Sequence, residues 1–217
     1  MTACRVCGAP CRPPFRAPTA EQAPDLDGRP GEPARSSLKR WIATCRGCGA
    51  SAPDLAALPE QARAVVRSAE YVALRRAGPF ERWAMIAERT GNPAEAGDAL
   101  LQAAWAAEDA GQDGAALRRR AVALWPKGTD AGAVLRELDV LRRAGDGPAA
   151  LARAAALDGM ALDENSSALL RFERERIAEG DTGRCMISSV LRPPAHRPHA
   201  TLGRASGTGF WARMLGR

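Results

Sequence analysis

The sequence predicts a mainly α-helical protein with a small ribbon module at its amino terminus. Two Cys-x-x-Cys pairs lie within the first 50 residues, helix-forming segments broken by Gly and Pro follow from residue 53, and a Gly recurs every 33 to 35 residues in that region. The 217 residues are 46% hydrophobic, which supports a core in the larger part. We therefore divide the chain into a ribbon with a long loop (1–53), a helical repeat domain (54–191) and a flexible basic tail (192–217).

The two cysteine pairs are the sharpest chemical signal. A Gly follows each pair and accepts the positive φ that such a tight turn needs. Two turns of this kind direct four sulfurs at one ion, and a closed shell of four thiolates is typical of structural zinc. We expect a structural Zn²⁺, with an iron site or a thiol redox pair as the alternatives. The expected ligands are Cys4, Cys7, Cys45 and Cys48.

The segment between the pairs is rich in Pro, Arg, Gly and Ala. Because six prolines interrupt it, we expect residues 12–37 to form a solvated loop without regular structure. A short extended segment, residues 41–44, then brings Cys45 to the metal. This is the layout of a zinc ribbon. Of the two remaining cysteines, Cys11 is expected to be a loop thiol.

The repeat predicts four tetratricopeptide-like units of two antiparallel helices each. In such a unit a Gly ends the first helix in a left-handed conformation, and the candidates are Gly78, Gly111, Gly145 and Gly180. We expect the first helices over residues 55–77, 93–110, 130–144 and 163–179. We expect the second helices over residues 80–90, 114–124, 147–157 and 182–191.

Helix pairs of this kind need a small side chain five residues after the Gly, where the two helices touch. The residues at that position are Trp83, Ala116, Ala150 and Cys185. Trp83 does not fit, although Ala84 beside it could serve, and the full consensus is absent, so the repeat is degenerate. Asp130 and Asp163 are expected helix caps.

The formal charge of +6 is unevenly distributed. No acidic residue follows Asp181, whereas six arginines do. Residues 1–53 hold eight basic and four acidic residues, which permits attraction to phosphate. Only Phe15 and Trp41 are available there to stack on bases, so nucleic-acid binding is an alternative function rather than the first one.

Several classes of function are not favoured. The chain has no signal-like start and no apolar run long enough to cross a membrane, so we expect a cytoplasmic protein without a membrane partner. It has no nucleophile elbow and no phosphate-binding Gly loop, and its two histidines, His196 and His199, lie in the predicted tail. We therefore expect no enzyme.

The cysteine pairs, the Trp-bearing segment before the second pair, Trp105 and the Arg142-Arg143-Ala-Gly145 sequence resemble a bacterial uncharacterised family, the domain of unknown function 2225. The resemblance implies the same four cysteine ligands and no established activity. Our leading hypothesis is a non-enzymatic scaffold in which the helical groove binds an unidentified protein or peptide. The alternatives are a nucleic-acid-binding ribbon protein and a thiol or metal redox sensor.

Overall fold

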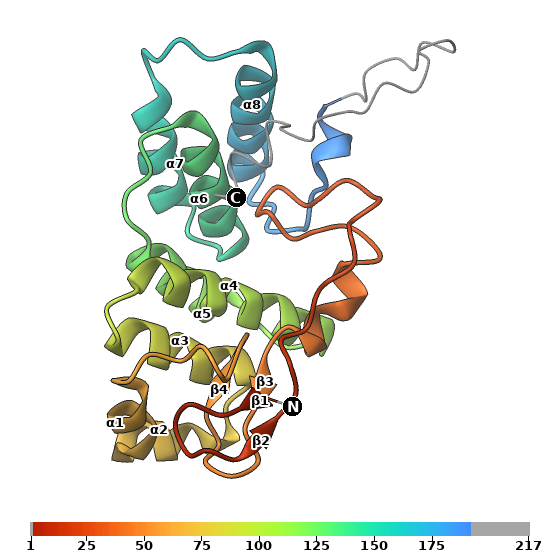
Figure 1. The fold of residues 1–217 in the computed structure, drawn as a ribbon. Coiled ribbons are helices and arrows are strands. Elements are labelled where there is room, and N and C mark those ends of the chain that lie inside the picture. Colours follow the sequence, from red (N-terminus) through yellow and green to blue (C-terminus); the bar gives the residue numbers. More distant parts are fainter. Residues whose placement is uncertain (1, 192–217) are drawn as a thin grey trace.

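The computed structural model describes residues 2–191, in which the chain is mainly helical, as the sequence predicts (Figure 1). The predicted tail, 192–217, lies outside these residues. The amino-terminal part holds two antiparallel hairpins joined by a long loop that ends in a 3-10 helix. The hairpins pair β1 (Thr2–Ala3) with β2 (Pro10–Cys11) and β3 (Ala43–Thr44) with β4 (Ser51–Ala52), and the 3-10 helix is η1 (Arg35–Arg40).

The helical body follows the second hairpin. Helices that are consecutive in the sequence pack together: α3 contacts α4, α4 contacts α5, and α6 contacts both α7 and α8 (Figure 1). The α-helices are α1 (Ala62–Arg67), α2 (Ala69–Ala73), α3 (Pro79–Arg89), α4 (Pro93–Asp109), α5 (Ala115–Leu124), α6 (Ala131–Arg143), α7 (Gly147–Ala154) and α8 (Glu164–Ala178). The short 3-10 helices are η2 (Leu74–Arg76), η3 (Ala155–Leu157) and η4 (Ile187–Ser189).

Side-chain caps start several helices where the sequence predicts them. Asp130 accepts a hydrogen bond from the backbone N–H of Ala133 at 2.9 Å, and Asp163 accepts one from Ser166 at 2.6 Å. Both predicted caps are confirmed. The prediction of one helix over 55–77 is wrong, because Ser68 is extended (φ −68°, ψ 152°). Ser68 ends α1 and caps α2 through its hydroxyl, so a break replaces the continuous helix.

Three of the four repeat glycines end a helix in the left-handed conformation. Gly111, Gly145 and Gly180 have φ values of 72°, 70° and 67°, as predicted. The prediction for Gly78 is wrong, since its φ is −63° and it precedes the first residue of α3. Pro79 explains the difference, because the residue before a proline is pushed out of the helical region toward extended backbone.

The predicted helix contacts hold at some positions and fail at others. Ala84 and Ala150 are buried, as expected, but Ala116 is exposed. Gly114 makes the close approach instead: a Cβ built on it would lie 3.1 Å from the Cβ of Ala104. The helix predicted over 182–191 is also wrong. Only the single turn η4 forms there, and the extended backbone around Cys185 pairs with another part of the chain.

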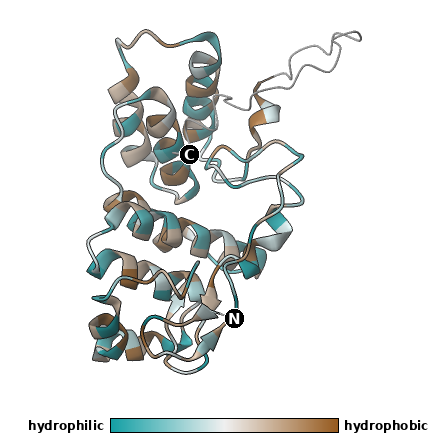
Figure 2. Cartoon of the chain, viewed as in Figure 1, coloured by the Kyte–Doolittle hydropathy of each residue, from teal (hydrophilic) through white to brown (hydrophobic). Residues whose placement is uncertain are grey.

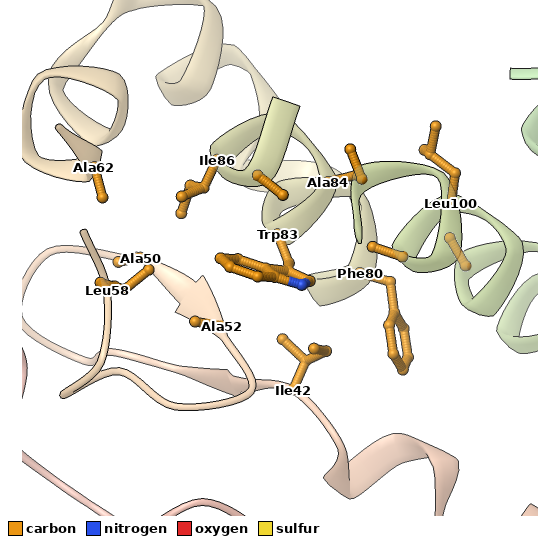
Figure 3. Close-up of a cluster of buried hydrophobic side chains, with 14 of the residues drawn as sticks. Ile42, Ala50, Ala52, Leu58, Ala62, Phe80, Trp83, Ala84, Ile86 and Leu100 are labelled. Carbon is orange, nitrogen blue, oxygen red and sulfur yellow. The ribbon is translucent and has the colours of Figure 1, made fainter. Parts of the chain in front are cut away.

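The buried apolar residues form two clusters. The first joins the ribbon to α1–α5, and the second fills the space between α6, α7 and α8. Most helices carry hydrophobic and hydrophilic residues together, as Figure 2 shows, which is the pattern of helices half-buried in a stack. Figure 3 shows Trp83 of α3 extending toward Ile42 and Ala52 of the ribbon. Because both are buried, the ribbon shares a core with the helices.

The loop between the hairpins is not wholly solvated, and this part of the prediction is wrong. It runs from the ribbon along one side of the helix stack (Figure 1), and Asp25, Leu26, Asp27 and Arg29 are all buried. Leu26 N–H donates to the carbonyl of Cys185 at 3.0 Å, and Ile187 N–H donates to the carbonyl of Pro24 at 3.0 Å. The loop therefore pairs with the last described segment of the chain.

Candidate metal centre and the loop beside it

Each cysteine pair lies in a turn built by the same backbone hydrogen bonds. In the first turn the N–H of Cys4 donates to Ala9 at 2.9 Å and the N–H of Gly8 donates to Cys4 at 2.8 Å. The second repeats this with Cys45 donating to Ala50 at 2.8 Å and Gly49 donating to Cys45 at 2.9 Å. Gly8 and Gly49 have φ values of 76° and 79°, so both turns need the conformation that favours Gly.

The two turns bring the four predicted ligands together. The sulfurs of Cys4, Cys7, Cys45 and Cys48 all lie within 4.8 Å of one another. The Cys4 and Cys48 sulfurs are 3.9 Å apart, and those of Cys7 and Cys45 are 3.6 Å apart. Bonds of about 2.3 Å to a tetrahedral Zn²⁺ would separate the sulfurs by about 3.8 Å. The four sulfurs could therefore hold a metal ion, and their spacing fits zinc.

The cluster is partly sheltered. Cys4 and Cys45 are buried, Cys48 is half-buried, and Cys7 is exposed. Close packing also leaves little room around the second turn, because a Cβ on Gly47 would lie 3.0 Å from Ala9 and 3.2 Å from the sulfur of Cys7. The site therefore lies at the surface, with two of its four sulfurs inside the ribbon.

The pKa values of the clustered cysteines are shifted in opposite directions. Burial raises the pKa of Cys45, but hydrogen bonds from two backbone N–H groups and from the thiols of Cys7 and Cys4 together outweigh it and bring the pKa to about 7. Burial raises the pKa of Cys4, and burial also raises the pKa of Cys48 far above its usual value. Clustered thiols resist ionising together, whereas a bound cation would displace their protons.

The helices hold the second cysteine turn through a small set of polar contacts. The hydroxyl of Tyr71 accepts from the backbone N–H of Ser51 at 3.1 Å and donates to the carbonyl of Gly49 at 3.2 Å. Arg82 donates to the same carbonyl at 3.3 Å. The second turn is thus positioned directly by α2 and α3, a contribution that nothing in the cysteine spacing indicates.

The two other cysteines lie outside the cluster. Cys11 is on β2, half-buried, with its sulfur 3.4 Å from the hydroxyl of Thr2. Cys185 is half-buried in the segment that pairs with the loop, and burial raises its pKa. Cys185 is therefore not the residue between two helices that the repeat predicts.

Asp27 attaches the loop to the helical body through a buried ion cluster that no local pattern in the sequence predicts. Its Oδ2 accepts hydrogen bonds from Trp105 Nε1 at 2.8 Å, Arg118 Nη1 at 2.8 Å and Arg143 Nη1 at 2.6 Å. Its Oδ1 accepts from the backbone N–H of Arg29 at 3.1 Å. Both carboxylate oxygens of a fully buried side chain are therefore satisfied.

A second carboxylate balances the charge of this cluster. Glu108 accepts from Arg118 Nη2 at 2.8 Å and from Arg143 Nη2 at 2.7 Å, so two guanidinium groups face two carboxylates. Burial raises the pKa of Asp27, but Arg143 and Arg118 more than offset it and lower the pKa to about 2. Asp27 stays ionised at neutral pH.

Another buried cluster, between α6 and α8, has more carboxyl groups than cations. Arg142 donates to Asp139 at 2.5 Å and to Glu173 at 2.8 Å, so one cation faces two carboxyl groups. Asp139 Oδ2 and Glu173 Oε1 are buried without a hydrogen-bond partner among the described residues. Burial raises the pKa of Glu173 to about 8, and burial raises that of Asp139 as well. The pair retains a proton at neutral pH.

No family model, curated protein or solved structure matches this chain. The resemblance to the uncharacterised bacterial family therefore stays a prediction. Within the described residues, no helix is long and apolar enough to cross a membrane.

Proposed function

We propose that the chain is a non-enzymatic zinc-binding interaction protein, in which Zn²⁺ holds the ribbon and the helical body contacts a protein partner. The metal part of the proposal is supported by the cluster of four sulfurs. The sulfurs of Cys4 and Cys48 are 3.9 Å apart, and those of Cys7 and Cys45 are 3.6 Å apart. Four thiolates fill a tetrahedral shell and leave no position for substrate or activated water. The ion would stabilise the folded ribbon.

The proposal for the helical body is a tetratricopeptide-like array that binds a protein or a peptide. Its support is the packing of consecutive helices from α3 to α8 and the left-handed Gly at the ends of α4, α6 and α8. In helical arrays each unit contacts mainly its neighbours, and the stack presents an extended surface to peptides or partner helices.

Metal analysis of the purified protein tests the first half of the proposal. Elemental analysis together with native mass spectrometry is expected to give one zinc per chain and a colourless sample. A coloured sample containing iron would contradict zinc. Loss of the ion under mild oxidant would favour a redox sensor over a structural site.

Cross-linking capture from the protein's own cells tests the second half. The tagged protein is cross-linked, purified with and without nuclease, and its retained partners are identified by mass spectrometry. A specific protein retained after nuclease treatment is the expected result. Loss of every partner with nuclease would contradict a protein partner.

A further inference from the structure

A groove of about 1050 Å³ lies beside the metal-binding turns. Two segments form its walls. The first is residues 10–16, which begin with β2, and the second comprises the end of η1, β3 and the start of the second cysteine turn, with Leu55 also lining the groove. The metal ligand Cys45 and its neighbour Arg46 both line the groove. Its shape therefore depends on the fold of the ribbon.

The groove is lined by positive charge alone. Five cationic side chains line it and no acidic residue does: Arg12, Arg16, Lys39, Arg40 and Arg46. All five are exposed. None of them forms an ion pair within residues 2–191, whereas many arginines of the helical body are paired with carboxylates. The charge in the groove is available to an anion from outside.

The groove also contains an aromatic ring and apolar surface. Phe15 is half-buried, and the guanidinium of Arg40 lies 4.1 Å from the centre of its ring. Pro13 and Pro14 precede the ring on the same wall. A base can stack on an aromatic face or on the plane of an arginine guanidinium, and here the two are adjacent.

We propose that this groove binds single-stranded nucleic acid. Arg12, Arg16, Lys39 and Arg46 would contact backbone phosphates, and the pair formed by Phe15 and Arg40 would stack on an unpaired base. A duplex also offers phosphates, but its bases are stacked inside the helix. It would therefore contact the cations and leave the stacking surface of Phe15 and Arg40 unused. The inference rests on the proposed zinc ribbon, because the metal-binding turn forms part of one wall.

The first measurement compares probes on the full chain. Fluorescence anisotropy is recorded with labelled oligo-dT and oligo-rU of about 20 nucleotides, which exceeds the usual site of about 4–16. A duplex of the same length and a poly-glutamate peptide serve as comparisons. Tighter binding of either single strand than of duplex and peptide is the expected result. Equal binding of all probes, or none, would overturn the proposal.

Two charge-matched variants then locate the site. The groove variant combines Arg12→Ala, Arg16→Ala, Lys39→Ala and Arg46→Ala. The control removes the same charge from exposed residues of α1 to η2, through Arg63→Ala, Arg67→Ala, Arg75→Ala and Arg76→Ala. The groove variant should bind the single strand at least about tenfold more weakly, and its salt slope should fall by about 0.7 for each lost phosphate contact. An equal loss in the control would overturn the assignment to the groove.

Phe15 separates stacking from simple charge attraction. Phe15→Ala should weaken single-strand binding by about fivefold or more and leave the salt slope unchanged, while Phe15→Tyr should restore binding. No effect of Phe15→Ala would overturn the stacking part of the proposal. Zinc content is measured for every variant. A wild-type chain without zinc would contradict the proposed function, whereas zinc-loaded variants with unchanged binding would contradict only this inference.

Discussion

In the ribbon, four strands of two residues each provide too few hydrogen bonds to fold alone, and the four-sulfur site joins the two turns. In the helical body, by contrast, buried apolar side chains and paired charges hold together helices that mostly contact their sequence neighbours. The loop that contains Asp27 joins the two hairpins of the ribbon and is also bound to the helical body. The comparison teaches that a four-cysteine site can organise a short segment, but the attachment of that segment to the rest of the molecule depends on a shared apolar core and, through the loop, on buried ion pairs.

Removal of a metal ligand should have the largest effect and should break the ribbon selectively. Cys45→Ser is expected to lose the zinc and the ribbon structure, because metal binding supplies about 10–16 kcal/mol in small zinc modules. Most of the helical signal should remain. Zinc content and far-ultraviolet circular dichroism measure both effects, with Cys11→Ser, outside the cluster, as the control that keeps the metal. Loss of all helicity would contradict the separation of the two regions.

Weakening the attachment of the loop to the helical body should lower the free energy of unfolding by less than the loss of a metal ligand does. The effect should, however, extend to the whole molecule. Asp27→Asn leaves two buried guanidinium groups, those of Arg118 and Arg143, with Glu108 as their shared carboxylate, and removing one member of a buried ion cluster costs about 3–5 kcal/mol. Denaturant unfolding measures this loss. Asp158→Asn is the control, because its side chain and that of its partner Arg174 are largely exposed, and it should cost less than about 1 kcal/mol. Similar losses in the two variants would argue against the role of Asp27.

The same carboxylate should make the protein sensitive to acid. Asp27 has a pKa of about 2 in the folded chain, below its ordinary value of 3.8. Its stabilisation of about 2 kcal/mol is therefore complete above pH 4 and disappears as the pH falls toward 2. Unfolding free energies measured from pH 6 to pH 2 should fall more steeply for the wild type than for Asp27→Asn. Parallel curves would show that Asp27 is not the group responsible.

The stability contributed by the cluster around Glu173 should depend on pH in the opposite direction and fall as the pH rises. A raised pKa, about 8 instead of 4.5, means that the folded state prefers the protonated carboxyl, so this contribution to stability is present below pH 4.5 and disappears as the pH rises to 8. Glu173→Gln, which resembles the neutral acid, should be more stable than the wild type at pH 9 and similar to it at pH 4. Exposed Glu175→Gln should show no such difference.

Removal of a single hydrogen bond that an uncharged side chain donates should have the smallest effect. Trp105→Phe deletes the donor to Asp27 but keeps most of the apolar side chain and both arginine contacts. The expected loss is about 1–2 kcal/mol in denaturant unfolding. A loss as large as that of Asp27→Asn would mean that packing, rather than the shared carboxylate, dominates this site.

The cysteine cluster was predictable because each turn is encoded locally, by two cysteines and a following Gly. Helix bounds were predictable for the same reason where caps, prolines and glycines mark them, as at α4, α6 and α8. The buried loop was not. Its Pro and Arg content resembles that of solvated segments, and Asp27 meets Arg143 across 116 positions of sequence. The expected helix over 182–191 failed because the backbone there pairs with Pro24 and Leu26, which repeat spacing does not encode.

The pairing of Pro24 and Leu26 with Cys185 and Ile187 has a consequence for synthesis of the chain. The ribbon leaves the ribosome first, and its two cysteine turns can meet once residue 50, which closes the second turn, has emerged. The loop between those turns, however, cannot complete its hydrogen bonds until residue 187 has emerged as well. On the ribosome, the ribbon can therefore fold while the loop still lacks these hydrogen bonds. The backbone contacts that form last join residues synthesised early to residues synthesised late.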